Sequence, residues 1–139
     1  MAGPHRTAAL LGFYGDSLDP EELTAGLGGV PTVGVRKGGT WHTARGAAKI
    51  APTGSWRIKA EDCSPGDLDG QIRSLLAPLT SDLDIWRDFS TRFGGRIFAG
   101  LFLAEWNEGM LLEAGTLALL AERGLYLDLD IYGAETAAE

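Results

Sequence analysis

The sequence predicts a single α+β domain, with a mixed or antiparallel sheet whose helices pack on one face. Two observations support this class. Apolar runs typical of strands alternate with amphipathic segments that begin with helix-capping residues. The first and last thirds each give the order strand, helix, strand, which predicts two such units side by side with a ferredoxin-like flavour. We expect one domain over residues 1–139, with an ordered core at about 7–132.

The first third begins with a strand and a well-marked helix start. Thr7 to Tyr14 is a short apolar run that predicts a buried strand. Asp19 is placed to cap the following helix, with Pro20 at its first position and Glu22 completing an Asp-x-x-Glu capping box. Glycines 26, 28 and 29 then predict an early helix end.

The next stretch is rich in glycine and is predicted to hold two short strands around a loop. One strand is expected within Thr32 to Arg36, and a second within Ser55 to Lys59. In the second strand, Trp56 and Ile58 should share one face, and Arg57 and Lys59 the other. We expect Gly38 to Gly46, between them, to be a mobile loop.

Two helical segments are predicted in the middle of the chain. Ser64 is the expected cap of the first, with Pro65 and Asp67 in its first turn, and Ser81 is the expected cap of the second. Apolar residues then recur at helical spacing, which predicts one buried stripe on each helix. The two stripes are Leu68, Ile72, Leu75, Leu76 and Leu79, and Leu83, Trp86, Phe89 and Phe93.

The last third predicts strand, helix and strand. Arg96 to Trp106 is apolar at both alternations, so we expect a long strand in the middle of its sheet. Leu112 to Arg123 predicts a helix that ends in a Schellman motif at Gly124. The final strand alternates strictly, so its two faces should differ in chemistry. One face carries Leu125, Leu127, Leu129 and Ile131, and the other Tyr126, Asp128, Asp130 and Tyr132.

Several short motifs recur in an order that resembles a known bacterial family, domain-of-unknown-function family 4279. The resemblance covers nearly the whole chain. It implies no activity and no catalytic residues, so no site residue is carried over from it. The matching pieces are Gly12 to Gly15, Leu18 to Leu23, Pro31-Thr32, Lys37-Gly38, Gly54 to Trp56, Leu101 to Leu103, Trp106 to Gly109, and Leu127 to Tyr132.

Composition excludes several classes of protein. The formal net charge of -7 and a pI near 4.8 argue against nucleic acid as the partner. The single cysteine excludes an internal disulfide and a cysteine-built metal site, and it fits a reducing compartment. No apolar run approaches the length of a membrane span. We therefore expect a cytoplasmic protein that binds neither nucleic acid nor a membrane.

Charge is segregated along the chain. No Asp or Glu occurs from Leu23 to Ala60, although six Lys and Arg residues lie there. Basic residues that alternate with tryptophans suit a binding surface, and the acidic remainder of the chain favours an acidic protein partner over nucleic acid. We predict that such a partner contacts Arg36, Lys37, Trp41 and Arg45. To do so, the three basic residues of this group must be exposed and unpaired within the fold.

Two alternatives to this partner surface stay open. In the first, Arg57 and Lys59 pair internally with the acidic face of the last strand, Asp128 and Asp130. In the second, the complementary surface belongs to another copy of the chain, which would make the protein a homodimer.

No residue pattern predicts a catalytic centre, a cofactor or a metal site. Cys63 fits a structural position before a helix, and His42 lies in the predicted loop. The leading hypothesis is thus a non-catalytic interaction module, for example one that inhibits another protein or confers immunity to it. The alternative is a small enzyme or ligand-binding protein that uses the carboxylates Glu105, Glu108, Asp128 and Asp130.

Overall fold

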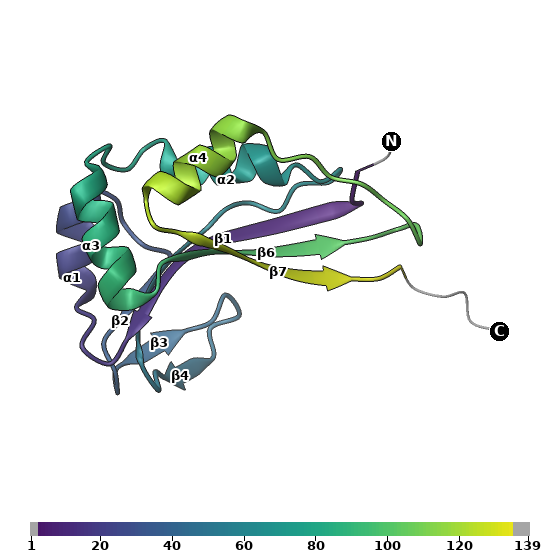
Figure 1. The fold of residues 1–139 in the computed structure, drawn as a ribbon. Coiled ribbons are helices and arrows are strands. Elements are labelled where there is room, and N and C mark those ends of the chain that lie inside the picture. The colour runs from purple at the N-terminus through teal and green to yellow at the C-terminus, as the bar shows by residue number, and fades with distance from the viewer. Residues whose placement is uncertain (1–2, 135–139) are drawn as a thin grey trace.

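A computed structural model describes residues 3–134. Within them, four helices cover one face of a five-stranded mixed sheet, and a two-stranded hairpin lies below its other face (Figure 1). The α+β class with helices on one face is therefore confirmed. The elements are β1 (Arg6–Gly15), α1 (Pro20–Leu27), β2 (Val33–Val35), β3 (Thr40–His42), β4 (Ala48–Ile50), β5 (Gly54–Lys59), α2 (Leu68–Leu76), α3 (Leu83–Phe93), β6 (Arg96–Phe102), α4 (Ala114–Glu122) and β7 (Tyr126–Tyr132).

The strand order is β2-β5-β1-β6-β7, with the first strand of the chain at the centre. β1 pairs antiparallel with both β5 and β6, whereas β7 runs parallel to β6. A parallel pair needs a crossover, and α4 supplies it. The last third is therefore a strand–helix–strand unit, as predicted. In the first third, β5 lies between β1 and β2, so these two strands do not pair.

The core lies between the sheet and the helices. Alternate residues of each strand point toward the helices, and the predicted helical stripes meet them. Trp56 on β5 and Trp86 on α3 are both fully buried. Phe13 lies between them, with ring centroids 6.1 Å and 6.3 Å away. This packing fixes which face of the sheet the helices leave open.

The predicted helix caps are correct in one case and shifted in two. Asp19 caps α1 by accepting a hydrogen bond from the backbone N–H of Glu21 at 3.0 Å. The expected capping box is wrong, because Glu22 instead binds Arg92 of α3, at 2.8 Å and 3.0 Å.

The cap of α2 lies three residues later than predicted, and the cap of α3 lies one residue later. Asp67, and not Ser64, caps α2 by accepting from Gly70 N–H. The Ser64 hydroxyl is engaged elsewhere, since it donates to the carbonyl oxygen of His5. For α3, the cap is Asp82 in place of Ser81, because the Asp82 carboxylate accepts from Asp84 N–H at 3.0 Å.

The end of α4 agrees with the prediction. Gly124 has φ +70°, the N–H of Leu125 donates to the carbonyl of Leu120, and the N–H of Gly124 donates to the carbonyl of Ala121. These two bonds make a Schellman motif. Leu120 and Leu125 are both buried, so the contact that accompanies the motif also joins the core.

Two further predictions are wrong. The expected loop Gly38 to Gly46 contains β3, and a turn at Thr43 to Ala47 connects it to β4. The strand expected from Arg96 to Trp106 ends at Phe102. Beyond it, the side chain of Glu108 folds back and accepts hydrogen bonds from the N–H groups of Ala104 and Glu105, which stabilises a turn where the strand would have continued.

Candidate binding face

The face of the sheet opposite the helices, here called the open face, is the candidate functional site. Side chains of β5, β1, β6 and β7 alternate onto it, and the β3–β4 hairpin covers only the end near β2 (Figure 1). No element among residues 3–134 covers the other end of this face (Figure 1). A sheet face that is lined with large side chains but left uncovered is a surface on which a partner can pack.

A ladder of alternating aromatic and cationic side chains crosses the open face. Trp41 on the hairpin lies 4.6 Å from the guanidinium of Arg57 on β5. Arg96 on β6 lies between two tyrosine rings, 4.8 Å from Tyr14 of β1 and 4.9 Å from Tyr126 of β7. Each such contact contributes about 0.5–1 kcal/mol at an exposed site, so the contacts join the hairpin to β5 and join β6 to its two neighbouring strands.

Tyr14 stands between the two arginines of this ladder. Burial of its hydroxyl raises the pKa of Tyr14, and the positive charges of Arg57 and Arg96 partly oppose that rise. The ring also lies close over Gly12, where an added Cβ would come within 2.6 Å of the tyrosine oxygen. Glycine at position 12 therefore lets the aromatic ring lie flat on the sheet.

A second row of stacked side chains marks the other end of the open face. The Arg6 guanidinium lies 3.9 Å from the Phe102 ring, which stacks on Tyr132 with centroids 4.7 Å apart and planes 4° apart. The Tyr132 hydroxyl donates to Asp130 at 2.7 Å, and this bond raises the pKa of Tyr132.

Between the two rows lies a small apolar recess. Its volume is about 200 Å³, and Leu10, Phe98 and Phe102 contribute to its walls. Gly100 forms part of the floor, where a Cβ would come 3.2 Å from the Phe102 ring. A recess of this size suits one side chain of a partner and is too small for a drug-sized ligand.

Cations on and beside the open face outnumber their acidic partners. Arg6 and Lys59 share a single carboxylate, Asp62, at 3.2 Å and 2.9 Å. Arg57 and Arg96 form no salt bridge within residues 3–134, and the buried Nε of Arg57 has no hydrogen-bond acceptor there. The face can therefore accept negative charge from outside.

The structure separates the four residues predicted to contact a partner. Arg36 pairs with Asp19 at 2.9 Å, and Lys37 pairs with Asp16 at 3.1 Å. The expectation that these two cations are unpaired is therefore wrong. The pKa of Asp16 is lowered by its hydrogen bond from Thr53, and further by Lys37.

The other two predicted residues belong to the hairpin. Arg45 is exposed near its turn and has no salt bridge in the described part of the chain. Trp41 is half-buried, because one side of its ring lies against Arg57. Trp41 is thus held against the open face, Lys49 lies opposite it on β4, and Arg45 lies in the turn of the hairpin.

The proposed internal pairing of Arg57 and Lys59 with Asp128 and Asp130 does not occur. All four side chains lie on the open face, but β1 and β6 separate β5 from β7. Three strand spacings of about 4.8 Å place the two groups roughly 14 Å apart, beyond the reach of an ion pair. The alternative in which these charges satisfy each other within one molecule is therefore excluded.

Most of the ladder was missed from the sequence. Tyr14, Arg96 and Tyr126 were assigned to strands but not to a site. A signal was present, because Arg96, Phe98 and Phe102 all fall on one alternation of a strand that the sequence marks as apolar. Only the strand order shows that these residues lie beside Tyr14 and Arg57.

The four carboxylates of the alternative hypothesis do not form one cluster. Asp128 and Asp130 lie on the open face, whereas Glu108 is engaged in the turn after β6 and Glu105 is exposed. Among residues 3–134, no three His, Cys, Asp or Glu side chains are close enough to hold a metal ion.

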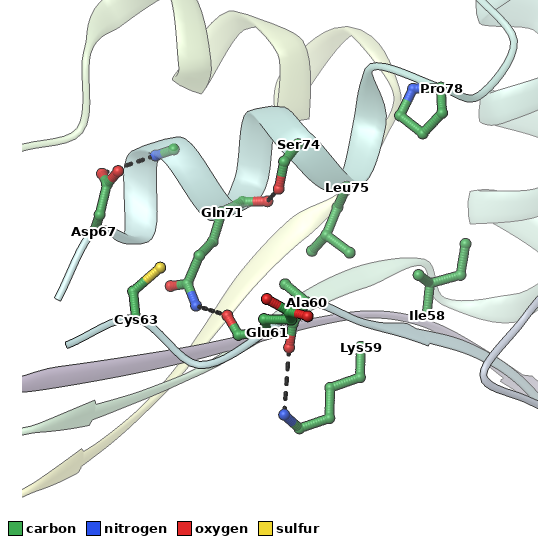
Figure 2. A pocket seen from close by; sticks show the side chains of 11 residues that line it. Ile58, Lys59, Ala60, Glu61, Cys63, Asp67, Gln71, Ser74, Leu75 and Pro78 are labelled. Carbon is green, nitrogen blue, oxygen red and sulfur yellow. Dashed lines mark hydrogen bonds between the residues drawn. The ribbon is translucent and has the colours of Figure 1, made fainter.

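A larger pocket of about 500 Å³ lies on the helical side, between α2 and the end of β5 (Figure 2). The side chain of Gln71 lines this pocket and forms three hydrogen bonds. Its amide N–H groups donate to the carbonyl oxygens of Glu61 at 2.8 Å and Thr7 at 3.0 Å, and its amide oxygen accepts from the Thr7 hydroxyl. Cys63 lines the same pocket, beside Asp67 (Figure 2). The polar groups satisfy one another, so this network anchors α2 to the central strand.

No helix in the described part of the chain is both long enough and apolar enough to span a bilayer.

Comparison with known proteins places the chain in one family. The family model described as Domain of unknown function (DUF4279) matches residues 5–134, which is nearly the whole chain, so the protein belongs to that family. The resemblance noted in the sequence is thereby confirmed. No curated protein matches the chain. No solved structure matches it either.

Proposed function

We propose that this member of the family is a non-catalytic interaction module that binds an acidic protein through the open face and the β3–β4 hairpin. The observation that carries the proposal is the surplus of cations there. Arg57 and Arg96 on the sheet and Arg45 and Lys49 on the hairpin form no salt bridge within residues 3–134. Arginines and aromatic rings are the side chains that most often dominate protein interfaces.

Two features favour a protein partner over single-stranded nucleic acid. Bases stack on free aromatic faces, but the rings of Tyr14 and Tyr126 already pack against Arg96, and Phe102 is stacked between Arg6 and Tyr132. The border of the face also carries Asp128 and Asp130, and the whole chain has formal charge -7. A phosphate backbone carries a charge at every nucleotide and would meet this acidic border, whereas an acidic protein can confine its carboxylates to the cations.

The proposal places the protein in the cytoplasm, where its free cysteine, Cys63, suits the reducing conditions. Inhibition of the bound partner, or immunity to it, is one form that the function can take. A rigid, preformed face suits such a role, because little conformational freedom is lost on binding.

The experiment is quantitative affinity capture from an extract of the native host, read by mass spectrometry. Arg45→Glu should lose the captured protein, and raising the salt concentration should release it from the wild type. Arg87→Glu is the control for charge reversal away from this surface, since Arg87 is also exposed, has no salt bridge in the described chain and lies on α3 in the helical layer. Its Nε donates to the carbonyl of Glu122 at 2.7 Å, so circular dichroism must show that this variant is folded.

Equal capture by the two variants would contradict the proposal. So would tight binding of a fluorescent single-stranded oligonucleotide by the wild type, because that result would assign the ladder to nucleic acid.

A further inference from the structure

The edge strand β7 has a free side. It pairs with β6 over all seven of its residues, and no strand within residues 3–134 pairs with its other side. The outward N–H and C=O groups are thus available to another strand. Seven residues are more than the average strand length, so the edge is long enough to hold an added strand in register.

The two faces of β7 have opposite chemistry. On the open face it presents Asp128 and Asp130, and on the helical side Leu129 and Ile131. These two aliphatic side chains are 41% and 58% exposed, because the end of β7 extends beyond α4 (Figure 1). These two exposed aliphatic side chains lie on the strand that has the free edge.

A second copy of the chain does not suit this edge. In antiparallel self-pairing centred on Leu129, Asp128 of one copy would lie directly opposite Asp130 of the other, twice. A shift of one residue at the symmetry centre would place Asp128 or Asp130 opposite the same residue of the second copy. Registers centred on Leu127 or Ile131 avoid these pairs, but they pair only three residues of each β7 strand. Like charges at directly opposed positions destabilise a strand pair. The strand that fits must carry cations where β7 carries aspartates.

We propose that the β7 edge binds an extended segment of another protein in which Lys or Arg alternate with aliphatic residues. The segment extends the sheet by main-chain hydrogen bonds, as in other cases of strand addition. Its cations lie beside Asp128 and Asp130, and its aliphatic side chains cover Leu129 and Ile131. This site lies at the opposite edge of the sheet from the hairpin and needs a partner of opposite charge, so it is independent of the function proposed above.

The first test uses a fluorescent seven-residue peptide of alternating lysine and valine, with acetylated and amidated ends, at 0.15 M salt. Fluorescence anisotropy should show saturable binding to the wild type, and Asp128→Lys with Asp130→Lys should weaken it by about tenfold or more. The same variant should gain affinity for a peptide of alternating glutamate and valine. Asp84→Lys with Glu122→Lys is the matched control, because it changes the net charge equally at exposed sites in the first turn of α3 and at the last residue of α4.

The second test asks whether the main chain carries the binding. Two versions of the lysine–valine peptide are N-methylated on alternate residues, one on each set. The peptide whose methylated amides face β7 should lose binding, and the peptide whose methylated amides face away should keep it. Only one edge of the added strand forms hydrogen bonds with β7. Hydrogen exchange should show new protection of the β7 amides when the unmodified peptide is bound.

Three results would overturn the inference: equal peptide binding by the two charge variants, equal binding of both methylated peptides, or unchanged exchange in β7. One further outcome assigns another role to the aspartates. If no peptide binds and Asp128→Asn with Asp130→Asn self-associates in sedimentation, the carboxylates only protect the edge against pairing. None of these readouts depends on Arg45, so failure here leaves the hairpin proposal intact.

Discussion

The two edges of the sheet are protected in different ways. The β2 edge has only three residues, follows Pro31, and leads directly into the hairpin, whose Trp41 packs on the neighbouring strand. The β7 edge has seven residues and is guarded only by Asp128 and Asp130. Short strands, covering elements and charges are alternative ways to prevent unwanted strand pairing. The comparison indicates that one edge is closed by structure and the other only by charge, which a partner of complementary charge can overcome.

The largest expected difference between the two edges is the loss of unfolding free energy when a large apolar side chain is removed. Trp56, one strand in from β2, is fully buried and donates its indole N–H to Thr24, so Trp56→Ala should lower the free energy of unfolding by about 3–5 kcal/mol. Leu129→Ala at the β7 edge should cost about 1 kcal/mol or less, because much of that side chain is already in water. Guanidinium chloride denaturation measures both. Similar losses for the two variants would mean that the β7 edge is covered in solution.

Substitutions at the first residues before α1 and α4 should differ less in their effect on the free energy of unfolding. Asp19→Ala removes the side-chain cap of α1 and should cost about 0.5–2 kcal/mol. Glu113 occupies the corresponding position of α4 but makes no side-chain capping bond, so Glu113→Ala should cost only what its exposed pair with Arg73 contributes, about 0.2–1 kcal/mol. The same denaturation assay compares them. A larger loss for Glu113→Ala would refute this ranking.

Surface charge around the hairpin should have a weaker effect on stability. Arg36→Glu with Lys37→Glu breaks two exposed ion pairs, to Asp19 and Asp16, and should cost about 1 kcal/mol in total. Arg45→Glu should change stability by less than about 0.5 kcal/mol, because no salt bridge is lost in the described chain. Urea midpoints check this. An Arg45→Glu variant that unfolds would show that Arg45 serves the fold and not a partner.

The smallest effect is confined to alkaline solution. The pKa of Tyr14 is raised in the folded state above its ordinary value of 10.0, chiefly by burial. The folded protein therefore holds this proton more tightly than the unfolded chain, so the stabilising contribution is complete below pH 10 and is lost as the pH rises through the folded pKa. Tyr14→Phe should show a shallower loss of stability above pH 10 than the wild type.

Tyr132→Phe provides the comparison at the other row of the open face, where the raised pKa comes from Asp130. Denaturation between pH 8 and 11 measures all three proteins. An unchanged alkaline slope in Tyr14→Phe would mean that the Tyr14 hydroxyl is solvated and not buried among the arginines.

Some elements were predictable because their signals are local. The Asp19 cap, the Schellman end at Gly124 and the alternation of β7 each depend on residues within one or two turns of each other. The prediction for the α2 cap failed because Ser64 fits the local pattern, but its hydroxyl donates to the carbonyl of His5, which is distant in sequence. Asp67, which was expected in the first turn, is the cap instead.

The hairpin and the ladder required tertiary information. The β3 and β4 strands have only three residues each, Thr-Trp-His and Ala-Lys-Ile, so neither is long enough to show an alternating pattern. They are stabilised where Trp41 meets Arg57, a contact between separate strands. Likewise, the sequence places Tyr14, Arg57 and Arg96 on strands but cannot place those strands beside one another.

By itself, the sequence determined the α+β class, the helical stripes, the separation of charge and the two faces of the last strand, since hydrophobic periodicity and capping chemistry act over short distances. The tertiary structure alone decided which strands are neighbours. Strand order therefore settled that Arg57 and Lys59 lie too far from Asp128 and Asp130 to pair, that aromatic rings and guanidinium groups form one ladder, and that β7 lies at an edge. Each of these results depends on contacts between residues that are distant in sequence, which no local pattern encodes.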